Sequence, residues 1–545
     1  MDNVDTVGLD RVDVLFIGAG PASLAGAIRL KQLLNEAERD ESVVVIEKAA
    51  KLGQHNLSGA VFHADVLDEL VPGWKEDDSA FVQKTLASRV ERDEVFFLLP
   101  RLPVKVPPFL IPPYMRHCGD YVISISELVN WLADRARSLG VEIYPGFVGK
   151  EVVIEDGTVV GIKLGDKGLS KEGQPQSNYV RGETLRTKLA IFGDGSLGVL
   201  SGQLIEKLNL SKGKNPQIYS VGVKEIIKLS ADDNNFGTRR AVYTMGFPTR
   251  ADIFGGGTLY SLGKDTVALA INLSLDWRYC DLDPQQELQL LKSHWLLRRM
   301  LYGGEVVSYG ARTIPEGGYY SLPEPVANGA IIIGDAAGLL STKKLKGLHY
   351  AIKSGMLAAE TAFGAIQQGD FSTRILKRYE TLLKNSFIEK DLREARNYRQ
   401  LFNKGGRLGI YLGTPLSLLL HRGIPGRLKT KPDYQHMTKA RLGRKYAGGI
   451  DKLTDVSLSG TQHREDEPSH ITLLDPQVCI ACGEEHGCHP CESFCPGQVY
   501  KFGEGRMILS PSNCLHCQTC RVKCPHQNIQ WEIPEGGDGP KYKLM

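Results

Sequence analysis

Apolar residues near the start of the chain change from strand spacing to helical spacing and back. Residues 12–17, VDVLFI, form a short apolar run that predicts a buried strand, and the apolar positions that follow at 24–34, LAGAIRLKQLL, have helical spacing. A second buried strand is predicted at 43–48, VVVIEK. Between the first strand and the helix stands GAGPAS. This order of strand, glycine turn, helix and strand predicts a parallel βαβ unit.

The glycine turn has the residue types that a dinucleotide site needs. Gly18 and Gly20 let the backbone approach a pyrophosphate, and the helix N-terminus stabilises the charge of that group. Glu47 ends the second strand and can accept a hydrogen bond from a ribose hydroxyl. Ser23 replaces the third glycine of the fingerprint and is small enough for close packing of the helix on the strand. The alternative is an ordinary βαβ turn that binds nothing.

A second apolar strand near the far end of the chain favours FAD as the dinucleotide. Residues 328–340, NGAIIIGDAAGLL, predict a strand, then Gly-Asp, then small residues that open a helix, and a similar IFGDGS occurs at 191–196. This pattern resembles the glutathione-reductase-type FAD fold, in which the Asp lies on the ribityl chain; a plain helix N-cap is the alternative for Asp335. The chain has no second G-x-G-x-x-G for NAD(P)H, so electrons are expected from a protein or an organic substrate. The predicted FAD-binding residues are Gly18, Gly20, Ala22, Ser23, Glu47, Lys48, Gly53, Ser58, Gly59, Gly334, Asp335 and Gly338.

The middle of the chain predicts further sheet structure. Residues 143–164 suggest a hairpin-rich sheet with a turn at Asp156-Gly157. Residues 215–310 contain alternating apolar segments around IFGGGTLYSL, which predicts a second sheet domain inserted into the FAD domain. The three successive glycines expose backbone N–H groups that could hold a carbonyl oxygen. A flexible turn is the alternative for these glycines.

Two apolar stretches suggest contact with a membrane surface. LPRLPVKVPPFLIPPYM, at 99–115, contains six prolines, more than a helix or a central strand tolerates. LGIYLGTPLSLLLH, at 408–421, is uncharged, and residues 391–446 around it contain 13 Lys and Arg against three Asp and Glu. An apolar stretch of 14 residues is too short to span a bilayer. A monotopic insertion with basic flanks is predicted, with a buried core helix as the alternative.

Composition narrows the functional class. The 42% hydrophobic and 24% charged residues are ordinary for a globular protein, and a net charge of +3 gives no field that points to nucleic acid. The acidic start, MDNVDTVGLD, contains no apolar run, so no signal or transit peptide is expected. No stretch reaches the roughly 18 consecutive apolar residues of a spanning helix.

The cysteines predict an iron–sulfur site. Nine of the 11 lie between 479 and 524, which indicates metal ligation in a reducing compartment and not a disulfide framework. Cys514, Cys517 and Cys520 have the C-x2-C-x2-C spacing of three corners of a [4Fe–4S] cluster. Cys495, in FCPGQVYKF, supplies the fourth corner. Zinc is the rival metal, but its sites seldom use this spacing followed by Cys-Pro.

The remaining cysteines predict a second cluster. CIACGEEHGCHPCESFCP places Cys479, Cys482 and Cys491 like a stretched first half of a two-cluster ferredoxin, in which the fourth cysteine of each half crosses to the other cluster. Cys524 would then complete this set, with Cys488 spare or competing with Cys491. The alternative is a plain loop with buried thiols.

Several longer motifs make the chain similar to one family. GAGPAS, HNLSGA, SYGARTIPEGGYYSLP, KKLKGLHYAIKSG, LSGTQHREDEPSHITL, FCPGQVYKF, NCLHCQTC and QNIQWEIPEGGDGPKY occur in the order seen in electron transfer flavoprotein:ubiquinone oxidoreductases, and the resemblance covers essentially the whole chain. It departs from the family at Ser23, at GDAAGLLSTKKLKG and at the extra cysteines.

The resemblance implies an electron-transferring-flavoprotein dehydrogenase. Such an enzyme carries FAD and one [4Fe–4S] cluster, oxidises reduced electron transfer flavoprotein, and reduces ubiquinone or menaquinone on a membrane surface. By resemblance, Cys495, Cys514, Cys517 and Cys520 hold the family's cluster, Gly255 and Gly256 contact the quinone, and 99–116 and 404–426 enter the membrane. No side chain has to act as a catalytic nucleophile, and no nucleic-acid partner is expected. Without a transit peptide, a prokaryotic form on the cytoplasmic face of the inner membrane is expected.

The predicted fold class is α/β and α+β: a glutathione-reductase-type FAD domain, an inserted sheet-rich quinone domain and a C-terminal ferredoxin-like [4Fe–4S] domain. A flavin-dependent reductase of isoprenoid double bonds, such as a geranylgeranyl reductase, shares the FAD fold but needs no such tail; a ferredoxin-fused scaffold is a third possibility. The predicted boundaries are 1–98, 131–214 and 311–395 for the FAD domain, 99–130 for a membrane-associated or quinone-domain segment, 215–310 for the quinone domain, 396–446 for a basic, helical membrane-surface segment and 447–545 for the iron–sulfur domain.

Overall fold

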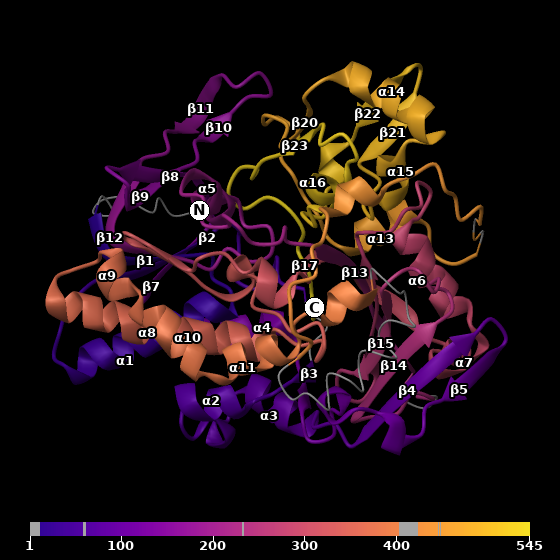
Figure 1. The fold of residues 1–545 in the computed structure, drawn as a ribbon, viewed down its shortest axis with the longest axis horizontal. Helices are drawn as coiled ribbons and strands as arrows, with labels where there is room; N and C mark the ends of the chain where they lie inside the picture. The colour runs from indigo at the N-terminus through magenta and orange to yellow at the C-terminus, as the bar shows by residue number, and fades with distance from the viewer. Residues whose placement is uncertain (1–10, 58–60, 231–233, 403–422, 445, 447) are drawn as a thin grey trace.

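Two large sheets and a small C-terminal domain make up the molecule (Figure 1). A computed structural model describes residues 11–57, 61–230, 234–402, 423–444, 446 and 448–545. The first sheet lies on the left of Figure 1 above a layer of helices, the second lies at the lower right, and the C-terminal domain covers the top right.

The first sheet is mainly parallel and follows the predicted βαβ order. Its strands run β18-β19-β12-β1-β2-β7, and the hairpin β8–β9 attaches to β12. The apolar runs form central strands because both faces are covered, as parallel sheets require. These strands are β1 (Arg11–Ile17), β2 (Val43–Glu47), β7 (Glu142–Pro145), β8 (Gly149–Glu155), β9 (Thr158–Leu164), β12 (Thr184–Phe192), β18 (Val326–Ala327) and β19 (Ala330–Ile332).

Helices α1 (Pro21–Glu36), α4 (Ile125–Ser138) and α8 (Leu348–Gln368) cover one face of this sheet. α1 and α8 pack closely because both have glycine at the contact: a Cβ on Gly355 would lie 2.0 Å from the carbonyl oxygen of Ala22. The predicted turn at Asp156-Gly157 joins β8 to β9, and both residues have positive φ, as hairpin turns of this length require.

The second sheet has the strand order β17-β13-β16-β15-β14-β4-β5. Its centre is the inserted domain predicted at 215–310, and two strands from much earlier in the chain extend it. β4 pairs in parallel with β14, from Arg92 opposite Arg240 to Leu98 opposite Gly246. The strands are β4 (Arg92–Leu99), β5 (Leu102–Lys105), β13 (Tyr219–Lys228), β14 (Arg240–Gly246), β15 (Gly255–Ser261), β16 (Thr266–Ser274) and β17 (Glu305–Pro315), with α6 (Pro284–Ser293) and α7 (Trp295–Met300) beside them.

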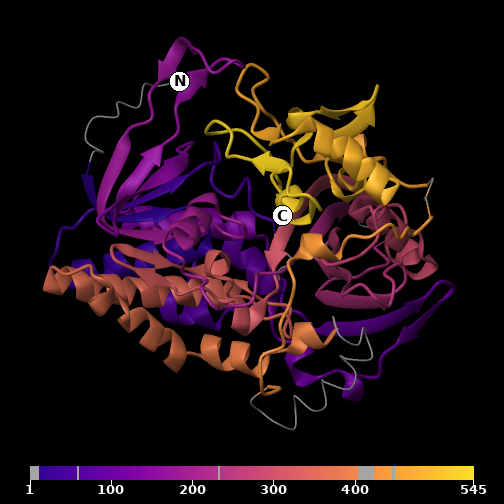
Figure 2. The ribbon, with the colours of Figure 1, turned by 45° about the horizontal axis from the view of Figure 1, so that its top comes forward.

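The C-terminal domain packs on the second sheet and sends its last residues into the first domain. One hydrophobic core contains the cysteines of the tail together with residues of β13 and β16. The terminal Met545 is buried, and its carbonyl oxygen accepts hydrogen bonds from Ser124 Oγ at 3.1 Å and Ser126 N at 3.3 Å. Its elements are α13 (Lys452–Leu458), β20 (Ile471–Leu473), α14 (Pro476–His486), α15 (Pro490–Phe494), β21 (Tyr500–Gly503), β22 (Arg506–Leu509), α16 (Thr519–Lys523) and β23 (Ile529–Trp531). Figure 2 shows the C-terminus between the two large sheets.

The proline-rich stretch forms an edge strand and two single 3-10 turns, and neither a helix nor a central strand, which its prolines exclude. β5 lies at the edge of the second sheet, where a missing N–H is tolerated, and the turns span Pro108–Leu110 and Pro113–Met115. None of the helices that the structure describes is both long and apolar enough to cross a bilayer. The uncharged stretch 408–421 lies outside the described residues.

The remaining elements connect these parts. They are β3 (Val61–Phe62), α2 (Asp65–Leu70), α3 (Ala80–Ala87), β6 (Tyr121–Val122), β10 (Lys167–Leu169), β11 (Pro175–Val180), α5 (Val199–Lys207), α9 (Thr373–Leu376), α10 (Arg378–Asn385) and α11 (Phe387–Glu394).

Candidate functional site

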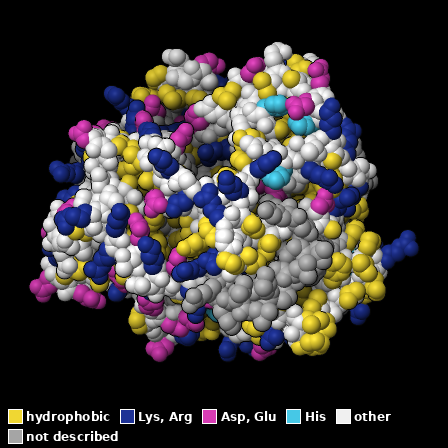
Figure 3. All heavy atoms as spheres, viewed as in Figure 1, with side chains coloured by type: hydrophobic (Ala, Val, Ile, Leu, Met, Phe, Trp, Pro, Cys, Tyr) yellow, Lys and Arg dark blue, Asp and Glu magenta, His cyan; other side chains and the backbone are white. Residues whose placement is uncertain are grey.

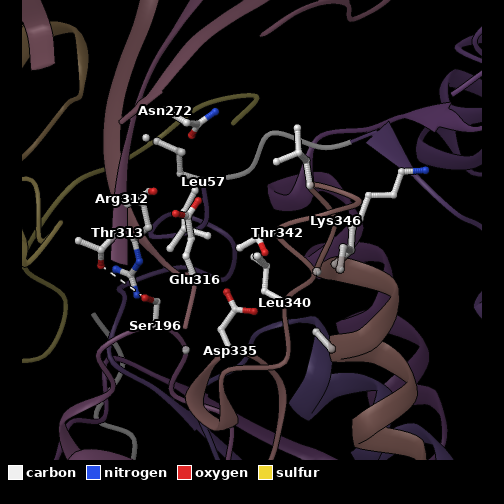
Figure 4. Close-up of a pocket in the computed structure, with 18 of the residues that line it drawn as sticks. Leu57, Ser196, Asn272, Arg312, Thr313, Glu316, Asp335, Leu340, Thr342 and Lys346 are labelled. Atoms are coloured by element: carbon white, nitrogen blue, oxygen red, sulfur yellow. Dashed lines mark hydrogen bonds between the residues drawn. The ribbon is translucent and has the colours of Figure 1, made fainter. Parts of the chain in front are cut away.

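One cavity of about 870 Å³ joins the first sheet, the second sheet and the C-terminal domain. Its walls include the turn after β1, the end of β2, the loop after β19 and the strands β13, β15, β16 and β17. Figure 4 shows Arg312 and Thr313 of β17 and Glu316, which follows this strand, on one side of the cavity, with Asp335 below them. A cavity of this size suits a cofactor or a drug-sized ligand.

The glycine turn leaves room for a ligand at the N-terminus of α1. Gly18 has φ +86°, and a Cβ there would lie 2.9 Å from the carbonyl oxygen of Gly193, so only glycine fits. Gly20 caps α1, and a Cβ there would meet no atom within 4 Å. Both residues line the cavity, so the N–H groups of the first helical turn face open space. This arrangement is what an anionic pyrophosphate requires.

The end of β2 fixes an acid and a base beside this turn. The carboxylate of Glu47 accepts hydrogen bonds from Ala19 N at 2.8 Å and Ala49 N at 2.9 Å, which hold it at the cavity wall. Lys48 is half-buried, and desolvation together with the charge of Arg312 lowers the pKa of Lys48 to about 8. Its ammonium lies 5.5 Å from the ring centroid of Trp531, which belongs to the C-terminal domain.

Asp335 also faces the cavity, but the chain around it differs from the expectation. Gly334 and Asp335 begin a short 3-10 turn, Gly334–Ala337, and the long helix α8 begins only at Leu348, so Asp335 does not cap it. Gly338, with φ +75°, turns the chain away after this short helix. Desolvation raises the pKa of Asp335 to about 6, against the opposing effect of Arg312.

The other predicted FAD residues fall into three groups. Ala22 lines the cavity. Ser23 is fully buried behind it, facing Gly193, and Gly53 packs on α4 with φ +81°, where a Cβ would lie 2.8 Å from Ser126 O. Ser58 and Gly59 lie outside the described residues.

Several cavity residues were not predicted from the sequence. Arg312 lines the cavity and donates a hydrogen bond to the carbonyl oxygen of His516 at 3.2 Å, so it connects the cavity to the cysteine motif. Lys224 is fully buried in β13, and desolvation lowers its pKa to about 7. The sequence feature that could have identified Arg312 and Lys224 is a charged residue inside an otherwise apolar strand. The other unpredicted polar residues of the wall include Asp194, Ser196, Asn272, Thr313, Glu316 and Lys346.

Gly255 and Gly256 line the same cavity and begin strand β15, so they do not form a flexible turn. The pairing of β14 with β15 ends at Thr244 opposite Gly257. Among the described residues, the backbone of Gly255 and Gly256 therefore has no strand partner on that side. A Cβ on Gly256 would lie 2.3 Å from Thr244 O, so the close approach of the two strands also requires glycine there.

The cavity extends to the exposed proline-rich stretch. Val106, Leu110, Ile111, Tyr114 and Met115 all line it. Phe109 and Leu110 are 79% and 62% exposed, high values for large apolar side chains. The exposed large apolar residues of this region are Leu99, Leu102, Val104, Phe109, Leu110 and Trp295, which we call the apolar rim. In Figure 3 hydrophobic side chains gather at the lower right, over β4 and β5.

Four of the tail cysteines form a buried group next to the cavity. Burial and the neighbouring thiols of Cys517, Cys514 and Cys495 raise the pKa of Cys520 well above the ordinary range. Cys514 Sγ accepts a hydrogen bond from His516 N at 3.4 Å. Gathered thiols with backbone N–H donors fit a [4Fe–4S] cluster, whose thiolate ligands such donors stabilise.

Two further cysteines are paired outside this group. Cys280 forms a disulfide with Cys488, and their Cα atoms lie 6.5 Å apart. The sequence predicted Cys488 as a spare or competing ligand and no disulfide framework. The structure instead joins it to a cysteine 208 residues earlier, a separation at which sequence spacing carries no signal.

Two family models match the chain. The model described as "Electron transfer flavoprotein-ubiquinone oxidoreductase, 4Fe-4S" matches residues 448–543, and the model described as "ETF-QO, ubiquinone-binding" matches residues 219–314. The first range contains all nine clustered cysteines, and the second contains Gly255 and Gly256.

Curated relatives match the chain from end to end. It is 38% identical to the mitochondrial electron transfer flavoprotein-ubiquinone oxidoreductase of Dictyostelium discoideum, over 98% of this chain and 91% of that protein. The human and Arabidopsis thaliana proteins of the same name are also 38% identical over 98% of this chain, with 89% and 84% of their own lengths covered.

Solved structures resemble the fold at low sequence identity. A geranylgeranyl bacteriochlorophyll reductase-like protein from Thermoplasma acidophilum aligns with a TM-score of 0.58 at 18% identity, over 75% of this chain and 92% of that one. A flavin-dependent brominase aligns with a TM-score of 0.51 at 16% identity, over 75% and 93%. Together with the 4Fe-4S family model, these likenesses confirm the predicted fold class.

Proposed function

The chain belongs to the electron transfer flavoprotein-ubiquinone oxidoreductase family, and from this membership we propose that it is a membrane-associated oxidoreductase that takes electrons from reduced electron transfer flavoprotein and delivers them to ubiquinone or another quinone. The observation that carries this proposal is the shared cavity. It is lined by the dinucleotide turn, by three residues of the iron–sulfur domain, Gln518, Trp531 and Ile533, and by the glycines of β15.

The dinucleotide end of the cavity fits FAD. When bound, FAD exchanges one or two electrons and a [4Fe–4S] cluster exchanges one, so together they can link a one-electron donor to a two-electron acceptor. The turn at Gly18 and Gly20 offers space and N–H groups to the pyrophosphate, and Glu47 offers a held carboxylate to a ribose hydroxyl. Asp335 faces the same space from the loop after β19.

The other end of the cavity fits a quinone. Gly255 and Gly256 have no described strand partner on one side, so the backbone N–H that points to that side is a candidate to donate to a quinone carbonyl. Leu110, Ile111 and Met115 line the route from this point to the apolar rim. An apolar entrance is what a lipid-soluble substrate needs.

The apolar rim also supports monotopic attachment to a membrane. Exposed apolar side chains that form a patch mark a surface that another apolar phase covers. The rim lies at the mouth of the quinone end, so insertion there would let a quinone enter from the bilayer. Of the second predicted insertion segment, 404–426, residues 404–422 lie outside the described residues, and only its end, 423–426, is described.

The location on the cytoplasmic face of a prokaryotic inner membrane stays a prediction. The relatives reported above are named as mitochondrial proteins. Protease accessibility of the chain in intact spheroplasts and in inverted membrane vesicles of its source organism tests it. Digestion only in the inverted vesicles would support the cytoplasmic face.

An isoprenoid reductase is the second candidate, because a geranylgeranyl reductase-like protein has a similar fold. Such a likeness at 18% identity bears on the fold alone. A reductase of that kind has no need for four gathered thiols beside the flavin cavity, and the tail supplies them.

Stopped-flow reduction distinguishes the two candidates. The full-length holoprotein is mixed anaerobically with reduced electron transfer flavoprotein, and flavin bleaching is followed before and after addition of a ubiquinone analogue. We expect reduction by the flavoprotein and reoxidation by the quinone. Failure of the flavoprotein to reduce it, together with reduction of a geranylgeranyl substrate, would replace the proposal with its rival.

A further inference from the structure

A second group of thiols lies in the C-terminal domain, apart from the four already described. Cys479, Cys482, Cys491 and Cys524 line one small pocket with apolar side chains. The apolar lining residues are Leu473, Val478, Phe494, Met507 and Ile529. No Lys, Arg, Asp or Glu is among the described residues that line it. Three of the thiol residues are buried and Cys491 is half-buried, and none of the four is in a disulfide.

The segment between Cys482 and Cys491 is structured, so the thiols do not sit on a plain loop. Asp475 caps α14 by accepting a hydrogen bond from Gln477 N at 2.8 Å, and Cys479 and Cys482, three residues apart, lie on one face of that helix. The helix ends at Gly487, with φ +69°, and α15 then returns Cys491 to the pocket. The insertion is therefore a helical extension with a tight return.

Two short helices connect the two thiol groups crosswise. α15 carries Cys491 of the second group in its first turn and ends at Cys495 of the first group, whose N–H donates to Cys491 O at 3.2 Å. α16 carries Cys520 of the first group and ends at Cys524 of the second, again with a hydrogen bond of 3.2 Å between the two backbones. Each connection spans four residues, about 6 Å of helical rise.

Amide groups support the sulfur atoms of the second group as they do in the first. Asn528 N donates to Cys524 Sγ at 3.3 Å, and Asn528 Nδ2 approaches Cys479 Sγ at 3.5 Å. Asn528 thus contacts the sulfur atoms of two of the four residues, and all four residues line the same pocket. Amide donors of this kind stabilise the thiolate ligands of an iron–sulfur cluster.

Cys488 forms a disulfide with Cys280, so it does not compete with Cys491 as a ligand of this set. Zinc is the remaining rival, because Cys482, His486 and His526 have ligand atoms within 4.8 Å of one another. A zinc ion bound by these three residues would leave the neighbouring thiols of Cys479, Cys491 and Cys524 without a metal to bind. The thiol set, with its crosswise links, is the more complete match.

We propose that Cys479, Cys482, Cys491 and Cys524 bind a second [4Fe–4S] cluster. The proposal goes beyond the function described above, which needs only one cluster. Each cluster takes up one electron and passes one electron on. Two clusters and a flavin would therefore form a longer path for electron transfer, and this path needs no additional oxidant or reductant. The short links through α15 and α16 place the two clusters next to each other, and α14 brings the second toward the outer surface of the tail in Figure 1.

The test is an anaerobic count of metal and acid-labile sulfide in the fully flavinated, full-length protein. We expect about eight iron and about eight sulfide per chain. A count of about four of each, with or without zinc measured in the same sample, would overturn the proposal. The dithionite-reduced protein should also give an electron paramagnetic resonance spectrum broadened by two interacting spins, and the spectrum of a single isolated [4Fe–4S]⁺ centre would argue equally against it.

Variants assign the ligands. Cys482→Ser should halve the iron count while FAD and the spectrum of the remaining cluster are retained, and an undiminished count would contradict the assignment. Cys488→Ser and the exposed Cys118→Ser are matched controls that should keep about eight iron. If Cys482→Ser loses FAD as well, the wild-type count and spectrum still decide, because neither depends on a variant.

Discussion

Gly20 shows how a missing side chain can make room for a ligand. The protein itself would accept a larger residue there, since a Cβ at Gly20 meets no atom within 4 Å. The open space is the cavity at the N-terminus of α1. Glycine is thus required at this position by the ligand and not by the fold.

Gly20→Val should therefore abolish FAD binding without unfolding the chain. The valine methyl groups would occupy the space of the pyrophosphate. The measurement is the ratio of flavin to polypeptide after purification, together with the circular dichroism spectrum. Gly202→Val in α5 is the control, because a Cβ there also meets no atom within 4 Å and Gly202 does not line the cavity. A yellow Gly20→Val protein with one flavin per chain would refute the site.

Met245 gives a cleaner test of the quinone end than the glycines do. A side chain on Gly256 would strike Thr244 O and disturb the sheet, so loss of activity there would not identify a ligand site. Met245 lines the cavity and is only half-buried. Met245→Trp should lower quinone reduction about tenfold or more, while reduction of the flavin by its donor survives; Met245→Leu, which conserves volume, should retain both. Equal loss of both half-reactions in the Trp variant would point to a structural effect.

Asp455 should make stability depend on pH. Burial and the nearby Glu225 raise the pKa of Asp455 to about 7, from 3.8 for the unperturbed group, and Gln285 Nε2 donates to its carboxylate at 2.7 Å. Between these two pKa values the unfolded chain loses a proton that the folded chain keeps. Folding therefore loses stability as pH rises through this window, by roughly 1 kcal/mol per pH unit, and the loss ends near pH 7.

Asp455→Asn should remove this dependence. The melting temperature of the variant relative to wild type should be higher at pH 8 than at pH 5.5, because the amide resembles the protonated acid. Asp134→Asn, at an exposed position on α4, is the control and should show the same difference at both pH values. A constant difference for Asp455→Asn would show that the carboxyl group is ionised throughout the range.

Single residues differed in how far the sequence could identify them. Gly18, Gly20 and Glu47 belong to one local pattern, and all three line the cavity. Arg312 could not be placed, because its role depends on a contact with a tail some 200 residues away. Lys224 could not be placed, because its burial depends on the pairing of β13 with β16 and β17. Side-chain periodicity contains no information on such contacts.

At the scale of elements, local patterns were predicted well and their partners were not. The β1–α1–β2 unit and the β8–β9 hairpin follow from neighbouring residues alone. The parallel pairing of β4 with β14 joins segments nearly 150 residues apart, and nothing in RDEVFFLL indicates which sheet it enters. That pairing places β5 and the proline-rich turns at the edge of the second sheet, where they carry the apolar rim.

The double variant Phe109→Asp with Leu110→Asp should release the protein from anionic liposomes. Each carboxylate that enters the hydrocarbon region costs up to about 2.5–3.5 kcal/mol. Flotation on a density gradient measures the bound fraction, with flavin content as a check on folding. Val180→Asp, at an exposed apolar position on β11 at the opposite end of the molecule, is the control and should float like the wild type. Undiminished flotation of the double variant would exclude these turns as an essential anchor.

At the scale of the whole molecule, the last residues of the chain hold the three parts together. Tyr542 is buried, and its hydroxyl accepts a hydrogen bond from Ala311 N of β17 at 3.3 Å and donates one to Leu515 O of the cysteine motif at 3.1 Å. Its backbone N–H donates to Gln54 O of the first domain at 3.1 Å. One residue thus contacts the flavin domain, the quinone sheet and the iron–sulfur domain, the three parts that together form the walls of the shared cavity.

Tyr542→Ala should therefore lower the stability of the whole molecule and not of the tail alone. Removing a buried aromatic side chain costs about 3–5 kcal/mol, and Tyr542→Phe, which removes only the hydroxyl, should cost about 1 kcal/mol. Flavin fluorescence, cluster absorbance and far-ultraviolet circular dichroism should report one common, lowered melting transition in Tyr542→Ala, because the lost contacts belong to all three domains. Tyr302→Phe, at an exposed position, should leave the transition unchanged. If Tyr542→Ala lost cluster absorbance at a clearly lower temperature than flavin, the tail would unfold independently of the other domains. Other contacts, such as the hydrogen bond between Arg312 and His516, would then have to fix the positions of the domains around the cavity.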